Sequence, residues 1–232
     1  MLNISIIIPT YNEAKNLPLL IEEAYNKIDK SLINIEFIIV DDNSPDGTGE
    51  VAKKLSLNFP VRVIHRKGKL GLGSAVIEGF KSSRNEIYGV MDGDLSHDPK
   101  ILNDLILALN DCDISIGSRF EIESSVDNWN WRRRLISRLG VALARILTGV
   151  KDPLSGYFFI RRNVIDNVPL TTKGYKILLE ILIKGRYMKY KEIPYTFRMR
   201  KFSTSKLNYK EFLLFAHQLV SYSFYKIIKL IK

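Results

Sequence analysis

Cysteine is almost absent from this sequence, in which Cys112 is the only one. An internal disulfide is therefore excluded, as expected for a protein of a reducing compartment. The three histidines have no metal-ligand spacing with Cys112, so a zinc site is not expected. Internal repeats, low-complexity segments and Gly/Ser linkers are also missing. Their absence favours one domain, residues 1–207, with a first half (1–118), a second half (119–207) and a C-terminal helix over 208–232 as an appendage.

Targeting and membrane-spanning segments are not recognisable either. No basic stretch followed by an apolar run opens the chain, so no signal peptide is expected. The apolar stretch 212–225 is interrupted by His217 and Gln218, whereas a membrane span needs about 20 predominantly apolar residues. We therefore predict no transmembrane span, and we expect the final helix, at 208–231, to lie in a membrane interface or to pack on a partner.

What the sequence has in excess is positive charge, and this charge is unevenly distributed. Residues 1–118 contain 12 Lys and Arg and 17 Asp and Glu, a net charge of −5, whereas residues 119–232 contain 23 and 8, a net charge of +15. An acidic half followed by a basic half predicts a cation or nucleotide site and then an anionic partner. Nucleic acid, anionic lipid and a phosphorylated substrate all satisfy this requirement.

Short apolar runs alternate with amphipathic stretches in the first half. This alternation predicts an α/β, Rossmann-like fold, with a mainly parallel sheet covered by helices on both faces. The predicted strands are residues 4–8, 36–40, 61–65, 87–91 and 113–117, and the predicted helices are 13–30, 47–57, 72–84 and 99–110. After residue 118 the sequence predicts basic amphipathic helices at 131–149 and 208–231, a helix near 174–186 and a strand at 189–198.

Polar motifs follow several of these strands, at the edge where such sheets bind ligands. They are Pro9–Glu13, Asp41-Asp42 and Asp92-Gly93-Asp94. The alternative for the second motif is a capped turn, after which Thr48 begins a helix. That alternative explains the turn but not why two acids end an apolar strand. Acids at two separate strand ends favour a shared nucleotide site, in which a carboxylate accepts hydrogen bonds from a ribose or a base.

The motif Asp92-Gly93-Asp94 predicts a divalent metal site. Residues two apart on an extended chain project to the same side, so both carboxylates would face one point, and Gly93 would allow close backbone approach. Two carboxylates with diphosphate oxygens and waters are usual ligands of Mg²⁺ or Mn²⁺. The alternative is a solvated loop that caps the helix beginning near Pro99.

Basic residues in the second half are candidates for binding phosphate, because the planar guanidinium of arginine suits phosphate oxygens. Arg133 and Ser137 are four apart and would share one face of a helix. That helix begins with Trp129, Trp131 and a run of arginines, which is typical of an interfacial helix. A solvated charged face is the alternative for each arginine. The serines lack the context of a nucleophile elbow, so covalent catalysis is not expected.

Taken in order, the motifs resemble those of a known family. They are Pro-Thr-Tyr-Asn-Glu from residue 9, Val-Asp-Asp-Asn-Ser-Pro-Asp-Gly-Thr from 40, Leu-Gly-Leu-Gly from 70, Asp-Gly-Asp-Leu-Ser-His from 92, Gly-Ser-Arg-Phe from 117, Trp-Arg-Arg-Arg-Leu-Ile-Ser-Arg from 131, Asp-Pro-Leu-Ser-Gly-Tyr from 152, Lys-Gly-Tyr from 173 and Ser-Lys-Leu from 205. This series resembles the dolichol-phosphate mannose synthases, family 2 inverting glycosyltransferases with a GT-A fold, over residues 3–210. The basic helix and the late basic loop are the parts most specific to that branch.

The resemblance implies an enzyme that transfers mannose from GDP-mannose to dolichyl or another polyprenyl phosphate, with Mg²⁺ or Mn²⁺ as the cofactor. Transfer of glucose or another hexose from a UDP-sugar is the alternative within this chemistry. A basic nucleic-acid-binding protein is the alternative of another class, but it leaves the acidic strand ends unexplained, so nucleic acid is not expected as a partner. The resemblance further implies a peripheral protein on the cytoplasmic face of a membrane, with room for a membrane-embedded partner subunit.

The resemblance also assigns roles to residues that match the family's motifs. The donor nucleotide would contact Pro9, Tyr11, Glu13, Val40 and Asp42, and the diphosphate would contact Asp92, Gly93 and Asp94. Asp94 would bind the metal with Ser96 nearby. Phosphate groups would be held by Arg119, Arg200 and Lys206, which with Asp94 form the expected catalytic set. The lipid phosphate would be received by Arg133 and Ser137. Two motifs depart from the family pattern: Asp-Gly-Asp replaces the common Asp-Ala-Asp at 92–94, and Phe-Ser-Thr-Ser at 202–205 replaces Gly-Glu-Ser before the lysine.

Overall fold

The computed structural model describes residues 1–119, 131–172, 176–198, 215 and 218–226, and over 131–139 it describes the helical backbone only. The strands of this part form a seven-stranded sheet in the order β3-β2-β1-β4-β6-β5-β7. Their bounds are β1 Leu2–Thr10, β2 Ile33–Asp41, β3 Val61–His65, β4 Ile87–Val90, β5 Ile114–Ser118, β6 Phe158–Arg161 and β7 Tyr190–Pro194. The expected strands at 4–8, 36–40, 61–65, 87–91 and 113–117 are all present.

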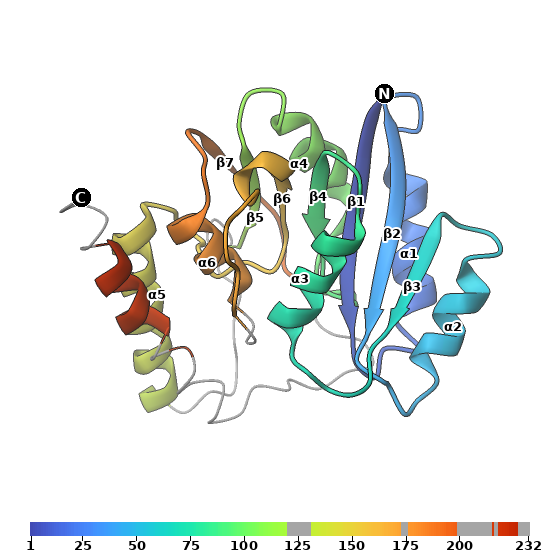
Figure 1. Cartoon of the computed structure of the whole chain (residues 1–232), viewed down its shortest axis with the longest axis horizontal. Helices are drawn as coiled ribbons and strands as arrows, with labels where there is room; N and C mark the ends of the chain where they lie inside the picture. Colours follow the sequence, from blue (N-terminus) through green and yellow to red (C-terminus); the bar gives the residue numbers. More distant parts are fainter. Residues whose placement is uncertain (120–130, 173–175, 199–214, 216–217, 227–232) are drawn as a thin grey trace.

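The sheet is mainly parallel, as predicted, and β6 is the exception. β6 runs antiparallel to both of its neighbours, β4 and β5, whereas the other described pairings are parallel. Parallel strands end at one edge, which lies at the bottom of Figure 1. The sequence analysis did not predict β6, because a short continuous apolar run carries no period that separates a buried strand from a helix segment.

Helices cover both faces of the sheet (Figure 1). One face carries α1 (Leu17–Lys27), α2 (Thr48–Leu55) and α4 (Leu102–Ala108), which follows the 3₁₀ helix η1 (Pro99–Ile101). The other face carries α3 (Leu72–Ser82) and α6 (Ile177–Lys184), and the 3₁₀ helix η2 (Arg162–Val164) follows β6. Each face has its own buried apolar cluster, so each helix turns one apolar side toward the strands.

A third apolar cluster packs against α6. α5 (Trp131–Thr148) and the helical residues 218–226 lie side by side at one end of the molecule (Figure 1). Ala144, Leu219 and Tyr222 pack there against Leu179 and Ile183 of α6. The predicted helix at 131–149 is therefore confirmed. None of the described helices is both long enough and apolar enough to span a bilayer.

Candidate active site

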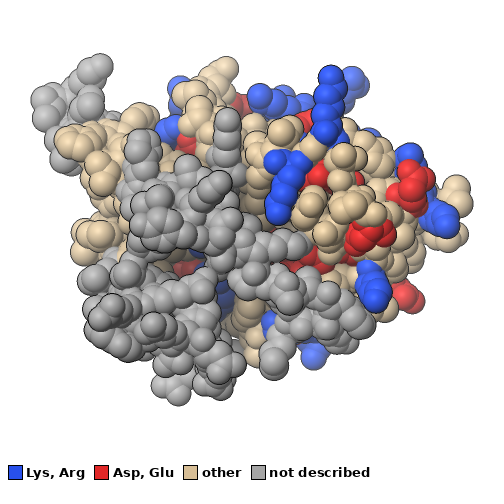
Figure 2. Space-filling model, turned by 90° about the horizontal axis from the view of Figure 1, so that it is seen from below, with Lys and Arg blue, Asp and Glu red and all other residues tan. Residues whose placement is uncertain are grey.

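The turn that follows β4 carries the acidic motif. Figure 2 views the molecule from the edge at which the parallel strands end. Asp94 is buried, and its Oδ1 accepts hydrogen bonds from the backbone N–H of Ser96, at 3.1 Å, and from the Ser96 hydroxyl. Leu95 adopts a left-handed conformation (φ 66°), which reverses the chain between these residues. The motif lies on a tight turn instead of an extended strand, and Ser96 fixes the direction of the Asp94 carboxylate.

His97 stabilises this turn by a hydrogen bond to its backbone and by packing against aromatic rings. Its Nδ1 accepts a hydrogen bond from the backbone N–H of Asp92 at 3.0 Å, and its ring stacks on that of Tyr157 with 4.9 Å between the centroids. The rings of Tyr195 and Phe197 complete the enclosure, with centroids 5.9 and 6.0 Å from that of His97. His97 is buried, and its ring nitrogen and ring face contact the backbone of Asp92 and the ring of Tyr157.

Gly156 allows the segment before β6 to close over the acidic turn. A Cβ atom at this position would lie 3.3 Å from both carboxylate oxygens of Asp92 and 3.3 Å from Cε1 of His97. The preceding Ser155 donates its hydroxyl hydrogen to the carbonyl oxygen of Gly117 at 2.7 Å, which ties the segment to β5. A larger residue at position 156 would therefore displace either the Asp92 carboxylate or the histidine behind it.

Two loops at the ends of β1 and β2 are joined by hydrogen bonds. Backbone N–H groups of the first loop donate to side chains of the second, in the pairs Asn12 to Ser44, Glu13 to Thr48 and Ala14 to Asp46, at 2.9–3.1 Å. Glu13 is buried, and a Cβ atom at Gly93 would lie 3.6 Å from its Cγ. The first loop thus connects the end of β2 with the acidic turn.

Pro9 and Val40 lie opposite each other on β1 and β2, and both are buried. Because Val40 packs in the apolar core, a ligand at this pair would meet backbone groups. Tyr11 follows β1 and is partly exposed, and Nζ of Lys69 lies 4.2 Å from the centroid of its ring. The glycine-rich loop that contains Lys69 therefore reaches the loop that contains Tyr11.

Asp42 holds that glycine-rich loop with its carboxylate. Its Oδ2 accepts hydrogen bonds from the backbone N–H groups of Leu70 and Gly71, at 2.9 and 3.0 Å, and its Oδ1 accepts one from Nη1 of Arg66 at 2.5 Å. The side chains of Arg66 and Asp42 are only 4% and 7% exposed. The carboxylate therefore has a structural task that the sequence analysis did not foresee, in addition to its expected contact with a nucleotide.

Replacing Arg66 by Met is expected to lower the free energy of unfolding by about 3–5 kcal/mol, because Asp42 would keep a buried charge without its partner. Urea denaturation measures this change. Arg62→Met is the matched control, since the Arg62–Glu36 pair is 41% and 29% exposed and its loss should cost less than about 1 kcal/mol. Equal losses in the two variants would contradict a special role for the buried pair.

Arg119, directly after β5, forms a bidentate ion pair with Asp152. Its Nε and Nη2 donate to the two carboxylate oxygens at 2.8 and 2.9 Å, and its backbone N–H donates to Oδ2 at 3.2 Å. Burial alone would lower the pKa of the Arg119 guanidinium, but the hydrogen bonds and charge of Asp152 outweigh that effect and raise it. The backbone N–H of Asp152 donates to Glu192 of β7. Arg119 is therefore a fixed, permanent cation beside the strand ends.

The acidic turn, the two loops, Arg119 and Asp152 all lie within the match to one family model. That model is described as glycosyl transferase family 2, and it matches residues 5–169. The chain belongs to this family. The family is the one that the motif resemblance led us to expect.

The names of two relatives of this family 2 chain both refer to mannose and to a polyprenol or dolichol phosphate. The dolichol-phosphate mannosyltransferase of Pyrococcus furiosus is 46% identical over 216 residues, which cover 90% of this chain and 60% of that relative. The polyprenol monophosphomannose synthase of Mycolicibacterium smegmatis is 37% identical over 216 residues, which cover 88% of this chain and 80% of that relative. The family 2 chain thus spans about three fifths of the length of the first of these proteins.

A solved structure shows the same fold at low sequence identity. It is the glucosyl-3-phosphoglycerate synthase of Mycobacterium tuberculosis in complex with Mn²⁺, UDP-glucose and phosphoglyceric acid. The TM-score is 0.69 with 19% identity, and the match covers 95% of the family 2 chain and 78% of that chain. The likeness confirms the expected GT-A fold.

The acidic turn of the family 2 chain offers a donor set that fits a divalent cation. Asp92 and Asp94 supply carboxylate oxygens and Ser96 supplies a hydroxyl, which are the hard oxygen ligands that Mg²⁺ and Mn²⁺ prefer. Within the described ranges, no three His, Cys, Asp or Glu side chains are grouped so that they alone could hold a metal. The remaining ligands would therefore be substrate oxygens and water, as is usual for Mg²⁺ at phosphate sites.

The chain after β7 returns to the acidic turn through Arg198. Its backbone N–H donates to the carbonyl oxygen of Ser96 at 2.9 Å, and its guanidinium binds Glu23 of α1 and Asp98, at 2.6–2.9 Å. Arg198 thus fastens the end of the second half onto the first half. Four expected phosphate-binding residues lie outside the described residues or side chains, and their roles stay predictions: Arg133, Ser137, Arg200 and Lys206.

Sequence reasoning missed the residues that hold the expected ones in place. They are Arg66 behind Asp42, His97 behind Asp92, Asp152 behind Arg119, and Tyr195 and Arg198 after β7. Two of them did leave a signal, because His97 and Asp152 belong to motifs that carried the family resemblance. The pairing of residues far apart in the chain, such as Arg119 with Asp152, has no signal in one sequence.

Proposed function

We propose that this chain transfers mannose from GDP-mannose to a polyprenyl phosphate such as dolichyl phosphate, with inversion at the sugar carbon. One observation carries the proposal: the acidic turn after β4 and the Arg119–Asp152 pair after β5 border a single strand-end site. The names of relatives at 46% and 37% identity support mannose as the sugar and a polyprenyl phosphate as the acceptor. A UDP-sugar donor with glucose or another hexose is the alternative that the sequence left open.

The arrangement suits direct displacement. A divalent cation held by Asp94, with Ser96 nearby, would neutralise charge on the departing nucleoside diphosphate. Arg119 adds a positive charge, and Asp152 fixes the orientation of its guanidinium before any substrate binds. A phosphate monoester is already largely ionised near pH 7, so the acceptor needs no strong general base from the protein. The residues of the site therefore position two anionic substrates and stabilise the leaving group.

A panel of nucleotide sugars tests this function. The purified chain would be incubated with a short polyprenyl phosphate, Mg²⁺ or Mn²⁺, and GDP-mannose, UDP-glucose or UDP-N-acetylglucosamine in turn. We expect a mannosylated lipid from GDP-mannose alone, and no product with EDTA. Product from a UDP-sugar in preference to GDP-mannose would establish the alternative donor. Salt-dependent DNA binding without any sugar transfer would instead favour the nucleic-acid-binding class.

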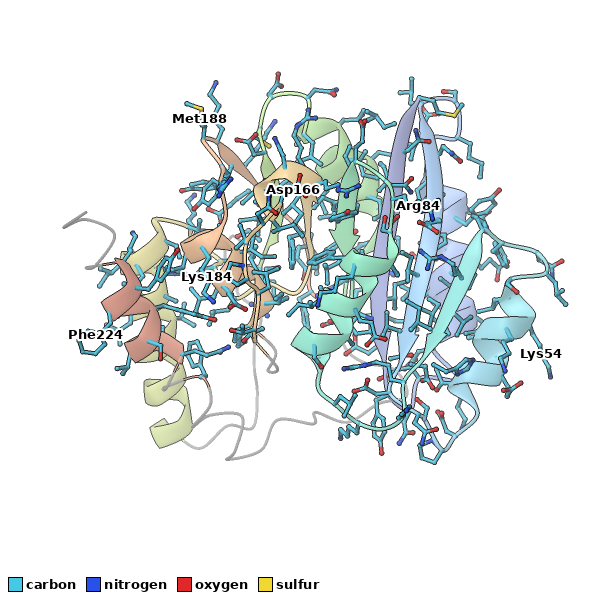
Figure 3. All side chains as sticks on the ribbon, in the orientation of Figure 1. Lys54, Arg84, Asp166, Lys184, Met188 and Phe224 are labelled. Atoms are coloured by element: carbon cyan, nitrogen blue, oxygen red, sulfur yellow. The ribbon has the colours of Figure 1, made fainter. Side chains whose placement is uncertain are left out.

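The face formed by α5 and residues 218–226 supports docking on a membrane. Ile146 on α5 is 79% exposed and Phe224 is 62% exposed, and the labelled Phe224 points away from the molecule in Figure 3. Arg145 and Lys226 belong to the same two helices. Exposed apolar side chains with neighbouring cations fit an anionic bilayer surface. We propose peripheral binding at the cytoplasmic face, and a membrane-embedded partner subunit stays a prediction.

Replacing Ile146 or Phe224 by Glu should weaken sedimentation with anionic liposomes about tenfold or more, because each variant removes apolar burial and adds repulsion. Met188→Glu is the matched control, since Met188 is 93% exposed and lies at another end of the molecule (Figure 3). Wild-type binding should also survive moderate salt in part, since salt does not screen apolar burial. Binding that is lost equally in all three variants, or absent in the wild type, would contradict this docking face.

A further inference from the structure

The phenol of Tyr195 is buried beside the proposed active site. Tyr195 follows β7 directly, is 4% exposed, and donates its backbone N–H to the carbonyl oxygen of Ser118 at 3.1 Å. Its Oη has no hydrogen-bond partner among the described residues. A buried hydroxyl without a partner destabilises a protein, and such groups are rare in folded chains. A ligand that accepts a hydrogen bond from this hydroxyl would remove that cost.

Tyr157 provides a direct comparison within the same aromatic cluster. The rings of Tyr195 and Tyr157 meet edge to face, with centroids 5.4 Å apart, and both side chains are buried. The hydroxyl of Tyr157 donates to the carbonyl oxygen of Asp98 at 3.2 Å. The Tyr157 hydroxyl thus stabilises the turn before η1, whereas the Tyr195 hydroxyl has no partner among the described residues.

The surroundings of Tyr195 are those of the proposed active site. Its ring lies 5.9 Å from that of His97, which supports the acidic turn. It also lies 6.4 Å from the ring of Phe197, which is itself 6.0 Å from His97 and over which the guanidinium of Arg119 sits at 5.7 Å. Tyr195 therefore packs beside groups that contact both the fixed cation and the acidic turn, and its backbone N–H is hydrogen-bonded to the residue that precedes Arg119.

We propose that Oη of Tyr195 donates a hydrogen bond to a phosphate oxygen of the substrate, between Arg119 and the acidic turn. This inference rests on the proposed function and assigns a further binding residue to the same site. A phosphate oxygen is the acceptor that fits, because Arg119 and a cation at Asp94 would draw phosphate to this place. The phosphate can belong to the donor diphosphate or to the lipid acceptor.

The phenol has the right protonation state for this task. Burial raises the pKa of Tyr195, and the negative charges of Asp92, Asp152 and Asp94 act in the same direction, against the opposing charge of Arg119. The group therefore keeps its proton throughout the neutral range and remains a donor. It adds a hydrogen bond to a phosphate without adding another charge beside the Arg119–Asp152 pair.

Tyr195→Phe and Tyr157→Phe form a matched pair of variants, each of which removes one hydroxyl from the same cluster. Without ligands, Tyr157→Phe should lower the melting temperature by roughly 2–4 °C, because it removes a hydrogen bond of the fold. Tyr195→Phe should leave the melting temperature unchanged or raise it. Two measurements test the phosphate contact: the Kd for GDP with Mn²⁺ by calorimetric titration, and the KM for a short polyprenyl phosphate at saturating GDP-mannose. In Tyr195→Phe, one of these two constants should rise about 10- to 100-fold.

The two arms separate the sources of the phosphate. Weaker GDP·Mn²⁺ binding would assign the contact to the donor diphosphate, and a raised acceptor KM with unchanged GDP·Mn²⁺ binding would assign it to the lipid phosphate. Unchanged values in both arms, or a melting temperature that falls as in Tyr157→Phe, would overturn the inference while leaving the proposed function intact. A wild-type chain that binds no GDP·Mn²⁺ and transfers no mannose would overturn the proposed function itself.

Discussion

Replacing Asp94 by Asn is expected to lower the rate of sugar transfer about a thousandfold or more and to abolish Mn²⁺-dependent binding of GDP. Asn keeps the shape of the side chain and an oxygen that can accept the hydrogen bonds from Ser96, so the turn should keep its conformation. It removes the negative charge that a divalent cation needs, and with it the neutralisation of the leaving diphosphate. Single-turnover kinetics with Mg²⁺ and Mn²⁺ and calorimetric titration with GDP measure the two effects.

Asp104→Asn is the matched control for this experiment. Asp104 is an exposed acid in the first turn of α4, about ten residues from the motif, and its loss changes the net charge by the same amount. This variant should transfer mannose at the wild-type rate. If Asp94→Asn also retained near wild-type turnover with an unchanged melting temperature, the assignment of the metal to Asp94 would be wrong.

The second large effect is expected at Arg119. Arg119→Lys should lower kcat/KM by about 10²- to 10³-fold, because one ammonium group cannot bind both oxygens of Asp152 and still face a phosphate. Asp152→Asn keeps the shape of the partner but removes its charge, so it should produce a smaller loss through a misdirected guanidinium. Steady-state kinetics with both substrates varied measure each change, and circular dichroism checks the fold.

Arg162→Lys is the matched control for Arg119→Lys. The Arg162–Asp166 pair lies on the surface, about half exposed on both sides, and Asp166 is labelled in Figure 3. An exposed pair contributes little, so this variant should behave as the wild type in stability and kinetics. Equal activity of Arg119→Lys and Arg162→Lys would reduce Arg119 to a structural partner of Asp152.

Much of the fold could be predicted because apolar runs and helical periods alternate over the first 118 residues. The positions of the acidic motif and of Asp42 at strand ends followed from the same alternation, since parallel strands end at one edge. β6 could not be predicted, because its four residues form an apolar run without a period. Its antiparallel direction depends on how the chain returns from α5, which is a property of tertiary packing.

The site was predictable in its motif residues but not in the residues that hold them in place. Asp94, Arg119 and Glu13 stand in motifs whose residue types already indicate cations and phosphates. Asp152, 33 residues after Arg119, could be matched to it only in three dimensions. The sequence likewise could not predict that the Tyr195 hydroxyl has no hydrogen-bond partner among the described residues, because this depends on the three-dimensional surroundings of the side chain.

The insertion of β6 between β4 and β5 sets the width of the proposed site. Adjacent strands lie about 4.8 Å apart, so the acidic turn after β4 and Arg119 after β5 start from backbones separated by about 10 Å. Because β6 is antiparallel to both neighbours, the chain enters it at the edge where β4 and β5 end. Gly156, just before β6, has no side chain and therefore leaves room for the Asp92 carboxylate. Had β4 and β5 been direct neighbours, the acidic turn and Arg119 would start from backbones only about 4.8 Å apart. One reversed strand thus adds a second strand spacing between the acidic turn and the fixed cation.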